Sequence, residues 1–188
     1  SITSEQMKSE TLCVTTLSTQ GLIKKSLVAD LPGPSSDTFV LAKVNDEDEI
    51  GWVIITENET NYLIITQLGM AIRFEGNEVR PMGLVAAGVN AIKLSKEDMV
   101  AGLVELKQGC EVLAVSSDGK GWRMEEKVFP VQGRYGQGVN TCKLKPDTVV
   151  VGLVAGKKNT QIALHCMKAA AKTIRLDEIP TGKRAVTG

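Results

Sequence analysis

"GVNAIKL" occupies residues 88–94 of the chain, and "GVNTCKL" occupies residues 138–144. The two stretches agree at five of their seven positions and lie 50 residues apart. Self-similarity at a period of roughly 20–50 residues is typical of repeat architectures. The pair of heptapeptides therefore predicts that other features of the chain recur at the same spacing.

The flanking sequence recurs in one order. Runs of β-branched and aliphatic residues predict a first strand in each unit: "TLCVTT" at 11–16, "NYLIIT" at 61–66, "EVLAVS" at 111–116 and "QIALHC" at 161–166. A turn and a second short stretch with a cation follow, and then a Pro-Gly corner at Pro32, Pro81, Pro130 and Pro180. A last apolar stretch closes each complete unit: "GWVII" at 51–55, "GLVEL" at 102–106 and "GLVAG" at 152–156.

These features predict an all-β fold of about four antiparallel four-stranded blades, with repeats near 11–60, 61–110, 111–160 and 161–188 after a polar lead-in at 1–10. Because one blade cannot bury both of its faces, neighbouring blades must stack into an arc or ring. Gly188 stands 50 residues after Gly138, where the last "GVN" strand is due. We therefore expect a fragment of a longer protein, or a fourth blade that another segment completes. The helix-like "CMKAAAK" at 166–172 falls in a turn, where we expect an irregular connection.

Composition sets the class of protein. The chain has 188 residues, of which 43% are hydrophobic and 23% are charged, as in soluble globular proteins. It lacks an apolar run of about 18 residues, and its polar start is unlike a signal peptide, so we expect a cytoplasmic protein without a membrane span. Residues 1–60 hold ten acidic and four basic residues, whereas 61–188 hold twelve and eighteen. A net charge of zero thus leaves room for a basic surface.

One stretch carries a family resemblance. "GMAIRFEGNEVRPMG" at 69–83, together with "GVNAIKL", resembles the C-terminal domain repeat of the bacterial DNA gyrase A subunit, to which the topoisomerase IV counterpart is similar. "GLIKKSLVADL" at 21–31 and "TIRLDEIPTGKRAVTG" at 173–188 fit the same repeat. The resemblance implies a β-pinwheel, in which propeller-like blades exchange strands. It also implies a non-catalytic, cofactor-free and monomeric domain, which binds and bends duplex DNA around its rim without base specificity.

The same resemblance implies partners. These are the ATPase B subunit of a type IIA topoisomerase together with the rest of its A subunit, working in ATP-dependent supercoiling or relaxation in the nucleoid. Gyrases carry a Gln-Arg-Arg-Gly-Gly-Lys-Gly box, and "QGRYGQG" at 132–138 keeps only part of it. Leu84 and Ala87 stand where family members often have arginine. The family domain has five or six blades, more than this chain provides, and the choice between gyrase and topoisomerase IV stays open.

Cations at one register suggest how DNA would bind. Sequence-independent binding needs positive charges spaced along a surface, and stacked repeats would align one cation per blade into a row. Residues Lys25, Arg73, Arg123 and Arg175 have this spacing. The full set of candidate DNA contacts is Lys24, Lys25, Arg73, Arg80, Arg123, Arg134, Lys172, Arg175, Lys183 and Arg184. Such cations could instead form a solvated face or ion pairs within a blade.

The sequence gives weaker support to metal binding and to catalysis. His165 adjoins Cys166 on an expected strand, where neighbours point to opposite faces, so we expect no shared metal ligation. "NDEDE" at 45–49 fits an acidic turn better than a calcium loop. We expect no metal site and no catalytic residues, with reduced, buried thiols at Cys13, Cys110, Cys142 and Cys166 and core roles for Phe39, Trp52, Phe74 and Trp122. The alternatives are a protein-interaction propeller and, less well supported, an enzyme with a site in a central channel.

Overall fold

The fold is all-β. The computed structural model describes residues 3, 5–33 and 38–185, and within these the chain forms antiparallel sheets linked by turns. The first sheet has the order β3-β1-β2-β6 and consists of β1 (Leu12–Ser18), β2 (Leu22–Leu27), β3 (Ile50–Glu57) and β6 (Val89–Asn90). The second has the order β10-β5-β4-β7 and consists of β4 (Asn61–Thr66), β5 (Met70–Glu75), β7 (Val100–Glu105) and β10 (Val139–Asn140).

The other two sheets are smaller in the described part of the chain. The third has the order β11-β8-β9 and consists of β8 (Glu111–Ser116), β9 (Gly121–Glu125) and β11 (Val150–Gly156). The fourth pairs β12 (Gln161–Leu164) with β13 (Lys172–Arg175). Among the described residues, no helix has the length and apolar character needed to cross a membrane.

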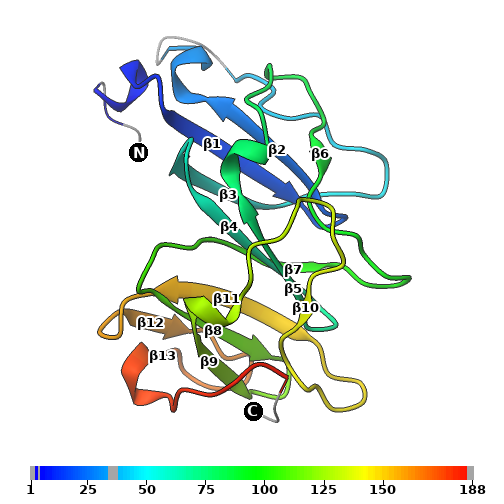
Figure 1. Ribbon diagram of the computed structural model, residues 1–188, viewed down its shortest axis with the longest axis vertical. Coiled ribbons are helices and arrows are strands. Elements are labelled where there is room, and N and C mark those ends of the chain that lie inside the picture. Colours follow the sequence, from blue (N-terminus) through cyan, green and yellow to red (C-terminus); the bar gives the residue numbers. More distant parts are fainter. Residues whose placement is uncertain (1–2, 4, 34–37, 186–188) are drawn as a thin grey trace.

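The "GVN" strands connect one unit to the one before it. In β6, Val89 pairs with Ile23 of β2, and in β10, Val139 pairs with Ala71 of β5. Each short strand therefore completes the sheet of the preceding unit, and Figure 1 shows both lying beside the unit before their own. This exchange is the defining feature of a β-pinwheel, and it confirms that expectation.

The glycine that opens each "GVN" strand is required by this crossing. Gly88 has φ +107°, and a Cβ on it would lie 2.5 Å from the carbonyl oxygen of Ile23. Gly138 has φ +77°, and a Cβ on it would lie 2.4 Å from the carbonyl oxygen of Ala71. Only glycine tolerates both the positive φ and the close approach. The repeated heptapeptide thus marks the two points where one unit's chain passes against the sheet of its neighbour.

A short 3₁₀ turn follows the second strand of each unit. These turns are η2 (Val28–Asp30), η3 (Gly76–Glu78), η4 (Glu126–Val128) and η5 (Leu176–Glu178), and a further one, η1 (Gln6–Lys8), precedes β1. After the turn, the corner of a unit runs parallel to the second strand of the unit before it, with bridges between Arg73 and Val131 and between Arg123 and Thr181.

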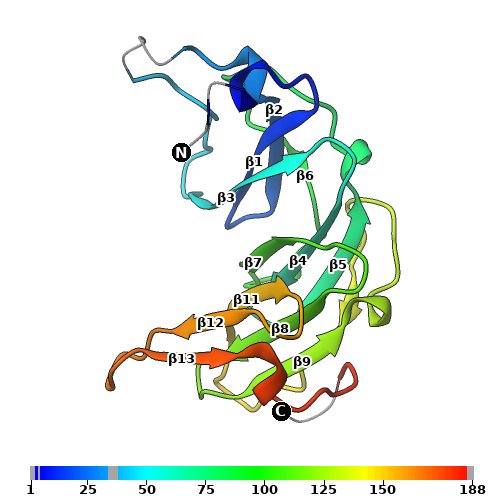
Figure 2. The ribbon, with the colours of Figure 1, turned by 90° about the vertical axis from the view of Figure 1, so that its left-hand side faces the viewer.

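The hydrophobic core lies between the sheets. Alternate residues of β4 face opposite ways, as the two-residue period of a strand requires: Tyr62 and Ile64 pack toward the first sheet, whereas Leu63 and Ile65 pack toward the third. A third cluster around Leu113 joins the third sheet to the fourth. Figure 2 shows the result, a curved succession of stacked sheets that runs from β1–β3 at one end to β12 and β13 at the other.

Two expectations about the core are wrong in part. Phe74 and Trp122 are buried, but Phe39 is 44% exposed because residues 38–44 form no strand. Cys13 and Cys142 are buried free thiols, whereas Cys166 is exposed. Cys166 lies in the connection between β12 and β13, which contains bends and no helix. Tyr62 is the aromatic residue that joins two sheets, since its hydroxyl lies 2.8 Å from Thr15 Oγ1 and 3.0 Å from Thr56 Oγ1.

Candidate nucleic-acid interface

Lys25 is the first of the cations that recur at one register. It lies in β2 and is fully buried. Its ammonium group donates to the carbonyl oxygens of Gly76, at 2.7 Å, and Asn58, at 3.3 Å. Gly76 opens η3, the turn of the second unit. The lysine therefore binds the main chain of the neighbouring unit and does not reach solvent.

Arg73 repeats this contact one unit later. From β5, its Nη1 donates to the carboxylate of Glu126 at 2.8 Å and to the carbonyl oxygens of Glu126 and Phe129, both at 3.3 Å. Its Nε donates to Oδ1 of Asn61, at 3.2 Å, within its own sheet. The guanidinium thus joins β4 and β5 to η4, the turn of the third unit.

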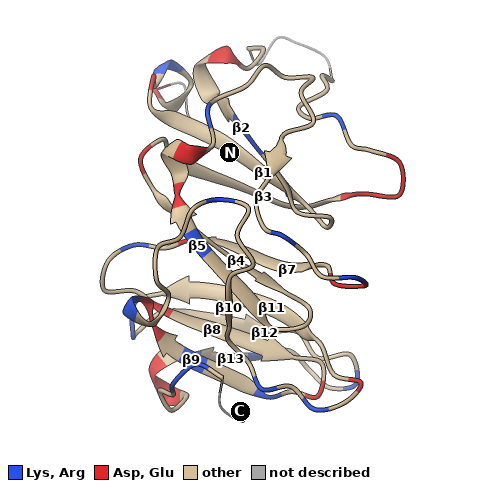
Figure 3. Cartoon of the chain, turned by 45° about the vertical axis from the view of Figure 1, so that its right-hand side comes forward, with Lys and Arg blue, Asp and Glu red and all other residues tan. Residues whose placement is uncertain are grey.

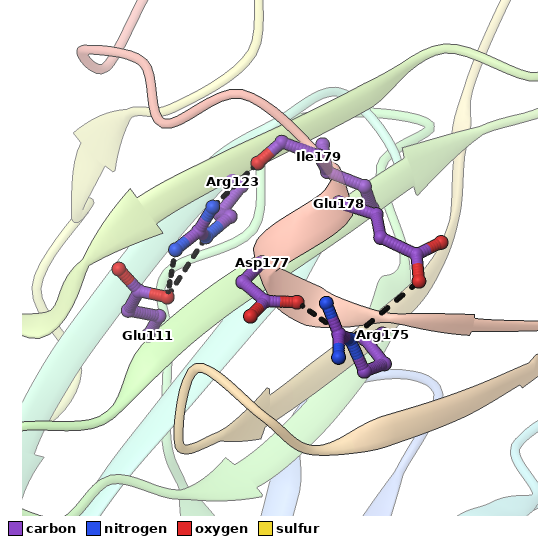
Figure 4. Close-up of polar contacts among 6 residues, drawn as sticks. All are labelled: Glu111, Arg123, Arg175, Asp177, Glu178 and Ile179. Carbon is purple, nitrogen blue, oxygen red and sulfur yellow. Dashed lines mark hydrogen bonds and ion pairs between the residues drawn. The ribbon is translucent and has the colours of Figure 1, made fainter.

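Arg123 makes the contact a third time, as Figure 4 shows. From β9, its Nη1 donates to the carbonyl oxygen of Ile179 in the fourth unit, at 2.6 Å. Its Nε and Nη2 lie 2.8 and 2.6 Å from Oε2 of Glu111 on β8. Both side chains of this ion pair are buried, at 8% and 5% exposure.

Arg175 differs from these three. It is exposed, and its Nε lies 3.1 Å from Oδ1 of Asp177 and 3.6 Å from Oε1 of Glu178, both in the adjoining turn η5 (Figure 4). The pairing is therefore local to one unit. Exposed ion pairs of this kind contribute little to stability.

Lys25, Arg73 and Arg123, each with the turn that it binds in the following unit, form what we call the inter-unit clasp. The main chain strengthens it, because Met82, Gln132 and Gly182 donate their N–H groups to the carbonyl oxygens of Lys25, Arg73 and Arg123, each at 2.8 Å. The expected row of cations along the rim is thus wrong for Lys25 and Arg123, which are buried, whereas Arg73 is partly buried with 15% of its side chain exposed. The physical reason is that a turn packed against a sheet leaves carbonyl oxygens without partners, and a long cationic side chain satisfies them.

Lys24 is also buried. Its ammonium group donates to the carbonyl oxygens of Leu41 and Leu84, the second at 2.6 Å. Burial away from water lowers the pKa of both Lys24 and Lys25 below their ordinary value. The paired lysines of the first unit therefore act within the protein and offer no charge to a ligand at the surface.

Two cations at the Pro-Gly corners have the same kind of role. Arg134 donates from Nη1 to the carbonyl oxygen of Asn90 and from Nε to that of Glu78, the second at 3.3 Å. Arg184 donates from Nη1 to the carbonyl oxygen of Asn140, at 3.1 Å. Each arginine reaches 44 residues back to the end of a "GVN" strand. These half-buried side chains hold exchanged strands in place.

Three candidate cations remain free at the surface. Arg80, Lys172 and Lys183 are exposed, and their side chains make no hydrogen bond or ion pair with any residue that the structure describes. Figure 3 shows where basic residues lie along the chain, both within strands such as β5 and β9 and in several connecting loops.

The degenerate box "QGRYGQG" forms a corner loop. Tyr135 has φ +67°, which is uncommon for a bulky residue, and it stays 50% exposed. Its N–H donates to the carbonyl oxygen of Ala91, at 2.9 Å, so the loop is tied to the end of β6. Tyr135 also lines an open hollow of about 550 Å³, together with Gln20, Asn90 and Lys93.

Sequence reasoning missed a second set of cations at one register. Lys43, Lys93 and Lys143 lie 50 residues apart, all are exposed, and none pairs with a carboxylate among the described residues. The signal was present, because Lys93 and Lys143 belong to the repeated heptapeptide itself. Lys93 and Lys143 follow the "GVN" strands in loops, and Lys43 lies in the corresponding segment of the first unit, which forms no strand. The expected row of cations lies instead on the second strand of each unit.

The acidic segments that contain Asp48 and Asp98 have structural roles. Oδ1 of Asp48 accepts hydrogen bonds from Thr19 Oγ1 and from the N–H groups of Gln20 and Glu49. Oδ1 of Asp98 likewise accepts from the N–H groups of Leu68 and Met99. The acidic segments are therefore turns stabilised by one aspartate each. Across residues 3, 5–33 and 38–185, no group of three His, Cys, Asp or Glu side chains could hold a metal ion.

Comparisons with known proteins agree with this geometry. Residues 60–106 and 111–155 match the model of a family described as "DNA gyrase C-terminal domain, beta-propeller". The DNA gyrase A subunit of Haemophilus influenzae is 35% identical over 75 residues, which are 40% of this chain and 8% of that protein. The DNA gyrase A subunit of Clostridium acetobutylicum is 37% identical over 70 residues, which are 37% of this chain and 8% of that protein. The aligned segment is thus a small part of these relatives.

Solved structures share the fold. The C-terminal domain of DNA topoisomerase IV matches with a TM-score of 0.84 at 20% identity, over 93% of this chain and 55% of that one. The DNA gyrase A C-terminal domain matches with a TM-score of 0.78 at 21% identity, over 96% of this chain and 60% of that one. The matched segments contain the strand exchange at β10 and the clasp at Arg73, so sequence and architecture lead to one conclusion: the repeats at residues 60–106 and 111–155 belong to the DNA gyrase C-terminal domain family, and the chain has the β-pinwheel fold.

Proposed function

We propose that this chain binds duplex DNA without sequence specificity and bends it, as the C-terminal domain of the A subunit of a type IIA topoisomerase. The observation that carries the proposal is the family match over two successive repeats, combined with a curved stack in which each unit repeats after 50 residues. A curved surface with a constant step suits a ligand that is itself a repeating chain of phosphates. On this proposal the partners are the ATPase B subunit together with the rest of the A subunit. The site of action is the cytoplasmic nucleoid.

The distribution of free charge supports binding by the later units. In the first 60 residues only four side chains are basic, and two of these, Lys24 and Lys25, are buried. Residues 161–188 hold five basic and two acidic residues. Exposed cations that contact phosphates release counterions, which drives binding at low salt. Arg80, Lys172 and Lys183 are the candidate DNA contacts that retain this capacity.

Bending has a cost that these contacts must offset. Curving a site of 20–30 base pairs by 40–90° costs of the order of 1–6 kcal/mol. Several phosphate contacts spread along a rigid arc can supply that energy at moderate salt. The rigidity comes from the inter-unit clasp and the exchanged strands, which fix each unit against the next.

The test is binding of a fluorescent 40-base-pair duplex to the 188-residue chain over a series of salt concentrations. We expect the logarithm of the affinity to fall linearly with the logarithm of salt, by about 0.9 for each phosphate contact. Exchanging Arg80, Lys172 and Lys183 for Ala together should reduce this slope by roughly two to three. The control replaces Lys8, Lys107 and Lys127, which removes the same charge from other exposed positions.

Bending is measured separately, by energy transfer between dyes at the two ends of a longer duplex. Binding that shortens the distance between the ends supports the proposal. A protein that binds no duplex at 50 mM salt, or that binds equally well at all salt concentrations, would contradict it. Binding that does not shorten the distance between the two ends would support DNA contact but refute DNA bending.

A further inference from the structure

The lysines of the repeated heptapeptide have a geometry that suits phosphate contact. Lys93 and Lys143 each follow two buried residues, Ala91 and Ile92 in one unit and Thr141 and Cys142 in the next. The backbone before each lysine is therefore anchored in the core, while the lysine side chain is exposed. A flexible cation on a fixed base loses little backbone entropy when it meets a ligand.

The main chain at this register is tied to the following unit. The N–H of Lys93 donates to the carbonyl oxygen of Gly136 at 2.9 Å, and the N–H of Lys43 donates to that of Ala86 at 3.3 Å. Both acceptors lie in corner loops, again 50 residues apart. Lys43 and Lys93 therefore stand at junctions between two units. In the third copy, the carbonyl oxygen of Thr141, two residues before Lys143, accepts from the N–H of Ala185 in the fourth unit at 2.8 Å. Successive lysines are thus separated by one step of the stack.

Lys93 also lies between two open hollows whose walls combine polar and apolar side chains. The larger one, of about 550 Å³, includes Gln20 and Asn90, and the smaller one, of about 370 Å³, includes Gln137. Ser95 and Asp98 line both hollows beside Lys93, and Glu97 lines the larger one. Uncharged amides and hydroxyls are the groups that, with lysine, make most contacts to phosphate and sugar oxygens.

The three copies of the loop that carries this lysine differ in net charge. Residues 38–49 hold one lysine against four acidic residues, a balance of −3. Residues 88–99 hold two lysines against two acids, a balance of zero, and residues 138–149 hold two lysines against one acid, a balance of +1. Lys43 thus has the same position as Lys93 and Lys143 but an acidic neighbourhood, which repels a polyanion.

We propose that Lys93 and Lys143 are phosphate contacts of one continuous duplex track that crosses the junctions between the second, third and fourth units, and that Lys43 lies outside it. This inference rests on the proposed DNA-binding function and assigns a site to it. The ligand is the sugar-phosphate backbone, so the track carries no base preference. These two lysines, and not the strand cations of the inter-unit clasp, are then the basic residues that recur along the DNA-binding surface.

The experiment compares two variants of the 188-residue chain, Lys93→Ala with Lys143→Ala, and Lys43→Ala alone, on the fluorescent duplex. We expect the double variant to bind about 10-fold more weakly at 100 mM salt and to lose roughly 1.8 from the salt slope, since each contact contributes about 0.9. Lys43→Ala should stay within about twofold of the unchanged chain. Thermal unfolding of all three proteins should coincide, because none of the three ammonium groups forms an ion pair with another described residue.

The possible outcomes distinguish a failure of the proposed track from a failure of the proposed DNA-binding function. If the unchanged chain binds duplex but the double variant binds equally well, the track is wrong and the proposed function survives. If Lys43→Ala weakens binding as much as the double variant does per charge, the role assigned to local charge is overturned. If the unchanged chain binds no duplex, the proposed function falls, and the track falls with it.

Discussion

A basic side chain that recurs once per unit has two different uses in this molecule, and its surroundings decide which. Lys25, Arg73 and Arg123 reach carbonyl oxygens of the following unit, whereas Lys93 and Lys143 are exposed on anchored loops. The spacing of the two sets is nearly the same, so periodicity alone does not distinguish a structural cation from a ligand contact.

Removing the guanidinium of Arg123 should destabilise the fold. Arg123→Ala would leave the buried carboxylate of Glu111 and the carbonyl oxygen of Ile179 without partners, and breaking a buried ion pair costs about 3–5 kcal/mol. Unfolding in urea measures this loss. The matched control is Lys127→Ala, whose exposed pair with Glu125 should contribute little to stability. Equal effects of the two changes would refute the clasp.

Cys142 should make the protein less stable in alkali. Burial raises the pKa of its thiol from 9.0 to about 12. Its contribution is therefore complete below pH 9 and is lost as the pH rises toward 12, because the unfolded chain then gives up a proton that the folded chain retains. The loss is at most about 1.4 kcal/mol per pH unit in this range.

The difference between the unchanged chain and Cys142→Ala isolates this effect. The gap in free energy of unfolding between the two proteins should narrow between about pH 9 and pH 11, because the variant has no thiol to titrate. A gap that stays constant over this range would show that Cys142 ionises alike in both states.

For individual residues, the sequence predicted where a side chain lies in the repeat better than it predicted whether that side chain is buried or what it contacts. It identified the register of Arg73 and Arg123 but could not reveal that the next unit's turn lies within hydrogen-bond distance, because that distance depends on how two sheets pack. Phe39 was expected in the core for its residue type, yet an apolar side chain is buried only if its segment joins a sheet.

The strand exchange is the feature that matters most at the scale of elements. Gly138→Ala should destabilise the protein by at least about 2 kcal/mol, because alanine would meet both an unfavourable positive φ and the carbonyl of Ala71. Gly133→Ala is the control, since a Cβ there has no neighbour within 4 Å. Thermal unfolding measures both variants. Similar midpoints would mean that β10 tolerates displacement from β5.

Strands were the most predictable elements. The stretches at 61–66 and 111–116 coincide with β4 and β8, because a continuous apolar run bounded by turns suits a strand buried on both faces. The short "GVN" strands were located, but their exchange with a neighbouring unit followed only from the family resemblance, and the structure identifies the partner as the preceding unit. A two-residue strand has too few side chains for its pairing to be read from periodicity.

At the scale of the whole molecule, stability should vary along the stack. In repeat proteins each unit depends on its nearest neighbours, and β4 is buried between two sheets whereas β12 and β13 are largely exposed. Amide hydrogen exchange should therefore be slowest in β4 and β8 and fastest in β12 and β13. Uniform protection across the four sheets would instead indicate that the stack unfolds as one unit.

The inter-unit clasp also bears on how such a chain could grow. Lys25 and Arg123 reach the next unit only through main-chain carbonyl groups, which every amino acid supplies. The receiving turn can therefore change its side chains without losing the bond, and only the donor must be kept. A gene duplication that copies one 50-residue segment would bring a donor for the module after it and an acceptor for the module before it, so an arc of this type could lengthen in a single genetic event.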